Sequence, residues 1–253
     1  MDAIVSQQRK FGIGQAPKRV EDQRFLTGAG RYTGDMIPDG ALIASVLRAS
    51  HAHARFTLSG LDEARAMPGV AAILTYEDIA DLGDLPCPGA VKNSDGTKMP
   101  LPPYPVLAQD VARHVGDALA FIVAESADQA RDAAEAIMVD YHSLDPVVGI
   151  EGARAEGAAL VWPELGTNLA FDSHHGDAQK TEKAFAKAHR IVALELVNNR
   201  LIGNPLEPRA AIGEYDRGTD TLLLTATAQG VHGVRGALAG PVFGVAPEKL
   251  HVV

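Results

Sequence analysis

The side chains best suited to chemistry lie in one polar stretch, residues 198–216. Asn199, Glu207 and Arg209 place an amide, a carboxylate and a guanidinium beside two prolines, and an alternating apolar run follows. Because Gly, Asn and Pro restrict the backbone, the stretch is predicted to be a turn between two strands that can aim its polar side chains. A solvated connection with Glu207 and Arg209 paired at the surface accounts for the same residues. The turn alone does not decide between the two interpretations.

Two histidines offer a different chemistry. His51 and His53 share one face of an extended backbone, which suits a pair of zinc or copper ligands. No carboxylate or cysteine lies close in sequence to complete a ligand shell. Structural or surface histidines therefore explain the pattern better than a metal site. A small metallohydrolase is the weakest of the functional hypotheses, and we predict no metal ligands among the protein side chains.

Composition and charge set outer limits on function. With 46% apolar and 22% charged residues, the chain has the composition of a soluble globular protein. A formal charge of -9 argues against a nucleic-acid or anionic-membrane surface. No apolar run is long enough to span a bilayer, and residues 1–10 lack the apolar stretch of a secretory signal, so a cytoplasmic protein is expected. The single cysteine, Cys87, can form no internal disulfide and cannot ligate an iron–sulfur cluster alone.

Hydrophobic patterns predict an α+β fold that begins after an N-terminal arm, residues 1–18. Strand-like runs lie at 41–48, 70–74, 115–124, 138–141, 191–197, 221–227 and 250–253. Helical patterns lie at 61–67, 126–137 and 177–189, and a further helix is expected to start in the latter half of 229–238. Residues 81–105 are rich in proline and predict a long irregular loop. The alternation of strands and helices predicts an α+β domain over 19–145, a loop-rich linker over 146–176 and a second unit over 177–253.

Six short motifs occur along the chain in an order that is typical of a known family. They cover residues 24–32, 50–55, 68–70, 115–117, 168–171 and 205–209, and the last of them reads Pro-Leu-Glu-Pro-Arg. Each motif is weak alone, but together and in this order the chain resembles the molybdopterin-binding large subunit of the xanthine dehydrogenase and aerobic carbon monoxide dehydrogenase family. The resemblance implies an α/β hammerhead domain followed by the beginning of a molybdopterin-binding α+β domain.

The resemblance also implies a reaction and a set of partners. Members of this family use a molybdenum–pyranopterin cofactor to hydroxylate a small molecule with oxygen taken from water. Electrons then pass to 2Fe-2S clusters and FAD, which would lie on an Fe-S subunit and an FAD subunit. The single cysteine of this chain fits that division of cofactors.

The implied site residues are Asn199, Glu207 and Gln229. Asn199 stands where many relatives carry a glutamine whose amide faces a molybdenum oxygen, Glu207 matches an acidic residue that orients its neighbours, and Gln229 matches a polar position near the cofactor. The glycine-rich cofactor loop and the catalytic glutamate of the family have no counterpart in residues 1–253, so no catalytic residue is expected in this chain. We therefore expect a further molybdopterin-binding chain or segment to complete the site. The alternative is a non-catalytic assembly or partner-binding module that lacks the cofactor.

Overall fold

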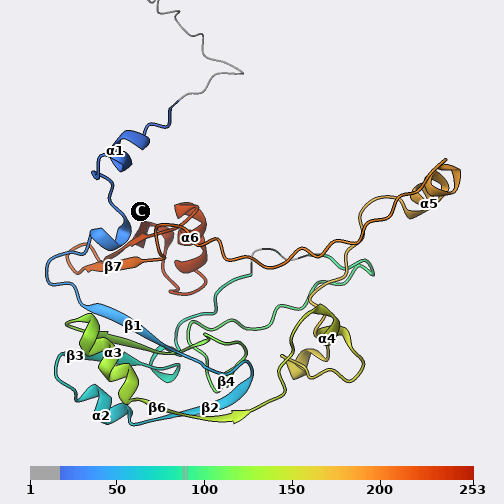
Figure 1. The fold of residues 1–253 in the computed structure, drawn as a ribbon. Coiled ribbons are helices and arrows are strands. Elements are labelled where there is room, and N and C mark those ends of the chain that lie inside the picture. The colour runs from blue at the N-terminus through green and yellow to red at the C-terminus, as the bar shows by residue number, and fades with distance from the viewer. Residues whose placement is uncertain (1–17, 88, 90) are drawn as a thin grey trace, which may run out of the picture.

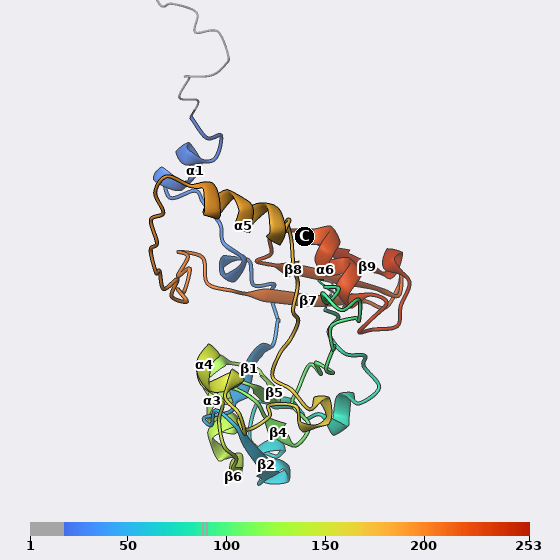
Figure 2. The ribbon, with the colours of Figure 1, turned by 90° about the vertical axis from the view of Figure 1, so that its right-hand side faces the viewer.

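The fold is an α+β arrangement in two parts, as the sequence predicts. The computed structural model describes residues 18–87, 89 and 91–253, so the predicted arm lies almost wholly outside the described residues. Among the described residues there are three sheets of three strands each. In the views of Figures 1 and 2, the part that contains β1 to β6 lies below the part that contains β7 and α6.

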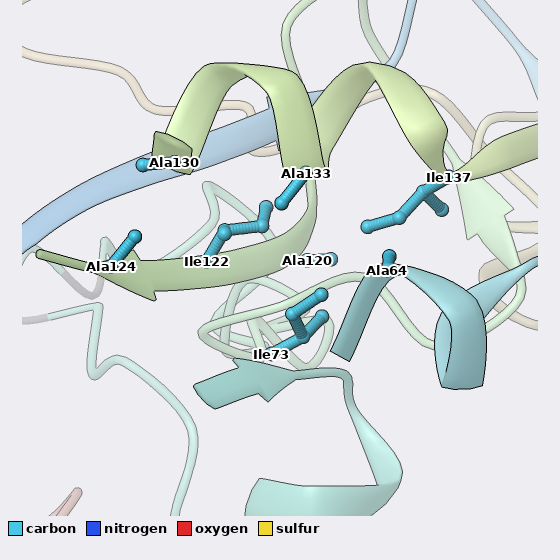
Figure 3. Packing of buried hydrophobic residues seen from close by; sticks show 8 residues of the cluster. All are labelled: Ala64, Ile73, Ala120, Ile122, Ala124, Ala130, Ala133 and Ile137. Carbon is cyan, nitrogen blue, oxygen red and sulfur yellow. The ribbon is translucent and has the colours of Figure 1, made fainter. Parts of the chain in front are cut away.

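The first sheet has β5 (Ala118–Ala124) between β1 (Ile43–Arg48) and β3 (Val70–Leu74), and both pairs are antiparallel. Helix α3 (Ala127–Ala136) begins where Ser126 accepts a hydrogen bond from the backbone nitrogen of Gln129 at 3.3 Å, as expected of an N-cap. The core forms between the sheet and the helices, and Figure 3 shows the buried side chains that meet there: Ala64, Ile73, Ala120, Ile122, Ala124, Ala130, Ala133 and Ile137.

The second sheet has β2 (Ala54–Ser59) between β6 (Met138–Ser143) and β4 (Val111–Ala112). Leu47 and Leu58 contact both the first core cluster and a second one around Phe56 and Leu119. Helix α2 (Leu61–Arg65) connects β2 to β3, and the short helix η2 (Glu77–Ile79) follows β3. The two sheets therefore share a continuous apolar interior, which fixes the first part of the chain as one body.

A third sheet forms the second part. In it β8 (Thr221–Ala226) pairs antiparallel with β7 (Ala211–Asp216) and parallel with β9 (Leu250–Val252). Helix α6 (Val231–Leu238) and the short helix η4 (Pro247–Lys249) provide the crossover that a parallel pair requires. Ala239, Val242 and Leu250 are the buried apolar residues here.

The strand predicted over 191–197 is absent, and that prediction was wrong. No β-ladder partner faces this run among the described residues, and every residue of 174–206 is exposed. The predicted helix before it is confirmed as α5 (Ala178–Lys187), with Asp177 as its N-cap. Figure 1 shows α5 projecting away from both parts of the molecule. An alternating apolar pattern favours burial of one face. A strand also needs a second strand to pair with its backbone N–H and C=O groups, and none of the described segments provides it.

Smaller departures concern short elements. The structure adds seven elements that were not predicted: α1 (Asp22–Leu26), η1 (Thr33–Asp35), β2, β4, α4 (Ile150–Arg154), η3 (Pro163–Leu165) and η4. The strand predicted from residue 115 begins only at Ala118, because Gly116 takes a positive φ of 92° that interrupts the extended backbone. The loop predicted over 81–105 is confirmed, since its described residues contain only an isolated bridge between Lys92 and Lys98.

Candidate functional site

Glu207 is the most tightly held residue of the 198–216 stretch. Its Oε1 accepts hydrogen bonds from the backbone nitrogen of Thr33 at 3.0 Å, from the Thr33 hydroxyl at 3.2 Å and from the Thr227 hydroxyl at 3.3 Å. Thr33 is buried, with 6% exposure, and Glu207 is half-buried. The carboxylate therefore joins three segments that are distant in sequence: η1, the 198–216 stretch and the end of β8.

Thr33 and Thr227 were not predicted as partners of Glu207. Thr33 lies in a glycine-rich segment, and Thr227 directly follows β8. Neither position carries a local sequence pattern that separates it from the other threonines of the chain. Only the long-range approach of the two segments brings both hydroxyls to one carboxylate oxygen.

Asn199 lies in the exposed run before Glu207. Its side chain has no hydrogen-bond partner within the described part of the chain, and residues 189–205 have no regular secondary structure. The turn tightens at Asn204, which has a positive φ of 44°, a conformation that asparagine tolerates better than most residues. The predicted turn thus leads into a strand on one side only, because β7 forms and the strand before the turn does not.

Gln229 lies at the bend that connects β8 to α6. Its side chain is exposed and has no hydrogen-bond partner among the residues described, and Gly230 forms the N-cap of the helix. The bend comes two residues after Thr227, which contacts Glu207. The contact network of Glu207 and the bend of Gln229 therefore belong to the same end of strand β8.

The opposite end of the β7–β8 hairpin is strongly acidic. Hydrogen bonds from the Gly218 backbone nitrogen and the Thr219 hydroxyl hold the pKa of Asp216 below its usual value. Hydrogen bonds from the Lys249 ammonium and the Tyr215 hydroxyl lower the pKa of Asp220. The hydrogen bond between Tyr215 and Asp220 also raises the pKa of Tyr215. These carboxylates stay ionised at neutral pH, and they lie across the length of the hairpin from Glu207.

The two histidines have structural contacts. The ring of His51 stacks on Tyr141, with 4.1 Å between the ring centroids. Nδ1 of His53 lies 2.9 Å from the carbonyl oxygen of Asp145, and His53 is 9% exposed. No group of three or more His, Cys, Asp or Glu side chains with metal-binding geometry occurs in the described ranges. The two histidines therefore pack the start of β2 against β6 and the residues that follow it.

The donors present fit an oxygen-rich organic cofactor better than a bare cation. The amides of Asn199 and Gln229 are free to donate to oxygen atoms, whereas Oε1 of Glu207 already accepts hydrogen bonds from Thr33 and Thr227. These contacts of Oε1 connect η1 with the end of β8. Over the residues that the structure describes, no helix is both long enough and apolar enough to cross a bilayer.

Two family models match the chain in tandem. Residues 27–145 match the model described as aldehyde oxidase and xanthine dehydrogenase, a/b hammerhead domain. Residues 161–253 match the model described as molybdopterin cofactor-binding domain. The first range contains the two sheets built from β1 to β6, and the second contains the Glu207 network and the third sheet.

Individual relatives agree with the family models. The chain is 32% identical over 232 residues to the 6-hydroxypseudooxynicotine dehydrogenase complex subunit gamma of Paenarthrobacter nicotinovorans, covering 91% of this chain and 29% of that relative. It is 30% identical over 254 residues to the carbon monoxide dehydrogenase large chain of Afipia carboxidovorans, covering 96% of this chain and 30% of the relative. The chain thus spans under a third of the length of these relatives.

A solved structure gives the same answer for the fold. Quinoline 2-oxidoreductase from Pseudomonas putida 86 superposes with a TM-score of 0.82 at 31% identity, over 96% of this chain and 30% of that one. The α+β fold class and the hammerhead architecture expected from the sequence are therefore confirmed. The chain belongs to the family of molybdopterin-binding large subunits of xanthine dehydrogenases and aerobic carbon monoxide dehydrogenases, and it corresponds to their N-terminal portion.

Proposed function

We propose that this chain is part of a molybdenum hydroxylase and that it forms one wall of the molybdenum–pyranopterin site. The observation that carries the proposal is the uncovered apolar run directly before Glu207. Its large apolar residues are 59% to 92% exposed, namely Ile191, Val192, Leu194, Leu196, Val197, Leu201, Ile202 and Leu206. So much apolar surface on one short segment marks a contact face for further polypeptide.

The relatives support the reaction class. Their printed names include dehydrogenases of carbon monoxide and of 6-hydroxypseudooxynicotine, and a nicotine 6-hydroxylase large subunit. From these names we infer that the assembly oxidises a small molecule with oxygen derived from water. Electrons would pass to 2Fe-2S clusters and FAD on partner subunits, and the cytoplasmic location expected from the sequence stays a prediction.

Within this chain, we propose that Asn199 and Gln229 hold the cofactor through their amides. Glu207 acts as a positioning residue, because its hydrogen bonds to Thr33 and Thr227 hold together the turn that follows Asn199 and the end of β8 that precedes Gln229. When bound, the molybdenum–pyranopterin group supplies the redox centre of the reaction. The proposed domain boundary lies near residue 145, with 146–176 as the connection to the cofactor-binding unit.

The test is purification of the tagged chain from its own host, with identification of every co-purifying polypeptide and measurement of molybdenum, iron and flavin. We expect an assembly that contains all three. We expect Gln229→Ala to lower the molybdenum content per chain severalfold, whereas Gln179→Ala on the exposed helix α5 leaves it unchanged. A lone 26.6 kDa species with stoichiometric molybdenum would refute the need for further polypeptide.

The second candidate function is a non-catalytic assembly module. The exposed helix α5 and the apolar run after it suit a partner-binding surface even without a cofactor. The same purification separates the two candidates. Partner chains without molybdenum, iron or flavin would identify the module, and molybdenum that depends on Gln229 would identify the enzyme.

A further inference from the structure

A large cavity in the described part of the chain lies away from the proposed cofactor residues. It has a volume of about 880 Å³ and lies between the 81–105 loop and the 146–176 segment. Its lining is mainly apolar and includes Leu101, Tyr104 and Trp162. Asn199, Glu207 and Gln229 do not line it. The volume lies within the range of about 300 to 1,000 Å³ that is usual for small-molecule sites.

One cationic side chain in this cavity is only partly satisfied. The guanidinium carbon of Arg113 lies 3.5 Å from the centroid of the Trp162 ring. Nη1 donates to the carbonyl oxygen of Val111 at 3.4 Å. Nε is buried without a hydrogen-bond partner, and Nη2 also donates to no group within the described residues. The Nε–Nη2 edge of the guanidinium is therefore vacant.

The carboxylates near Arg113 do not fill this edge. Asp117 accepts a hydrogen bond from the backbone nitrogen of Arg113 at 3.0 Å and lies 3.7 Å from Nδ1 of His114. Glu164, Asp117 and Asp110 act on the guanidinium only through longer-range attraction, and burial lowers the pKa of Arg113 despite them. A partly buried charge without a paired oxygen is costly, and the fork of a guanidinium matches a carboxylate.

We propose that this cavity binds a small apolar monocarboxylate. The carboxylate pairs with the Nε–Nη2 edge of Arg113, and the apolar body lies between Trp162 and Leu101. Because the guanidinium is held only by the indole and by one long hydrogen bond, a change in the side-chain torsions of Arg113 can turn the buried edge towards the ligand. The ligand combines an apolar ring or chain with a single negative charge, which separates it from neutral aromatics and from small hydrophilic anions.

The chain carries two built-in reporters of this cavity. Trp162 is its only tryptophan and Cys87 its only cysteine, and both line the cavity. We would titrate the chain with benzoate while following tryptophan fluorescence and the rate of Cys87 alkylation by iodoacetamide. Benzyl alcohol tests the need for charge, and acetate tests the need for an apolar body. A saturable change in fluorescence and protection of Cys87 are expected with benzoate alone.

Variants identify the groups responsible. Arg113→Gln is expected to weaken benzoate binding at least tenfold, because the paired charge is lost. Arg113→Lys is expected to give an intermediate affinity, and Leu101→Ala to weaken binding severalfold through lost apolar contact. Arg131→Gln, on the surface of α3, is the matched control and should bind benzoate normally.

Circular dichroism of each variant tests its fold. If Arg113→Gln does not fold, the half-exposed Leu101→Ala variant still decides the outcome. The proposal is overturned if benzoate gives no saturable signal or if benzyl alcohol binds equally well. It is also overturned if folded Arg113→Gln and Leu101→Ala both bind benzoate like the unmodified chain.

Discussion

Oε1 of Glu207 accepts a hydrogen bond from the backbone nitrogen of Thr33 at 3.0 Å, across 174 residues of sequence. This contact ties η1 to the start of the cofactor-binding unit, and the Thr227 hydroxyl extends it to the end of β8. The segment before the first sheet is thereby connected to the third sheet.

Removal of the Glu207 carboxylate should loosen this connection. Glu207→Ala leaves the buried Thr33 hydroxyl and backbone nitrogen without their acceptor, and should cost about 1 to 3 kcal/mol of unfolding free energy. Glu207→Gln keeps an acceptor oxygen and should cost less. Urea denaturation measures both changes. Glu248→Gln, an exposed glutamate in η4, is the control, and equal effects at the two positions would contradict the proposed connection.

A close backbone contact at Gly83 should tolerate no side chain. The backbone nitrogen of Gly83 donates to the carbonyl oxygen of Val242 at 2.9 Å, and a Cβ at Gly83 would overlap the backbone oxygen of Pro241. Gly83→Ala must push the two loops apart, so we expect a loss of about 1 to 3 kcal/mol in thermal or urea unfolding. Gly240→Ala has free space for its Cβ and is the control. Unchanged stability of Gly83→Ala would show that the loops separate freely.

Asp78 should contribute to acid sensitivity. Hydrogen bonds from the Thr75 backbone nitrogen and hydroxyl, with the nearby Arg65 charge, lower the pKa of Asp78. Because the folded pKa lies below the unfolded value of about 3.9, the stabilisation is complete above that value. This stabilisation is lost as the pH falls from the pKa of Asp78 in the unfolded state towards its lower pKa in the folded state. Asp78→Asn should flatten this part of the pH profile of unfolding, whereas exposed Asp81→Asn should leave the slope unchanged.

The central strand of the first sheet should be highly sensitive to cavity formation. Ile122 is fully buried in β5 and contacts the helix side of the core. Ile122→Ala should destabilise the chain by about 2 to 5 kcal/mol, through lost apolar burial and the cavity left behind. Chemical denaturation checks this value. Val115→Ala, at a 64% exposed site, should change stability by less than about 0.5 kcal/mol.

Elements with local signals were predicted well from sequence. The caps Ser126 and Asp177 begin α3 and α5 where the pattern placed them. The two-residue strand β4 carries no such signal, because its pairing with β2 is imposed by the fold. The strand predicted over 191–197 fails for the opposite reason, because here a local pattern is present but a partner strand is not. Its apolar alternation is real, but a strand forms only when a second strand completes its hydrogen bonds.

The candidate site was only partly predictable for the same reason. The Pro-Leu-Glu-Pro-Arg motif drew attention to Glu207 and, through the family resemblance, to Asn199 and Gln229. The contacts of Glu207 with Thr33 and Thr227 depend on three distant segments meeting, which no local pattern encodes. Arg113 likewise gave no signal, since its interest arises from stacking on Trp162 some fifty residues later.

The uncovered run between α5 and Glu207 has a consequence for biogenesis. An apolar, strand-forming stretch with open backbone donors and acceptors readily pairs with a second copy of itself. At high concentration, chains without companion polypeptide should self-associate through this stretch. Covering this stretch early, before chains meet one another, therefore protects the folded protein as well as completing its site.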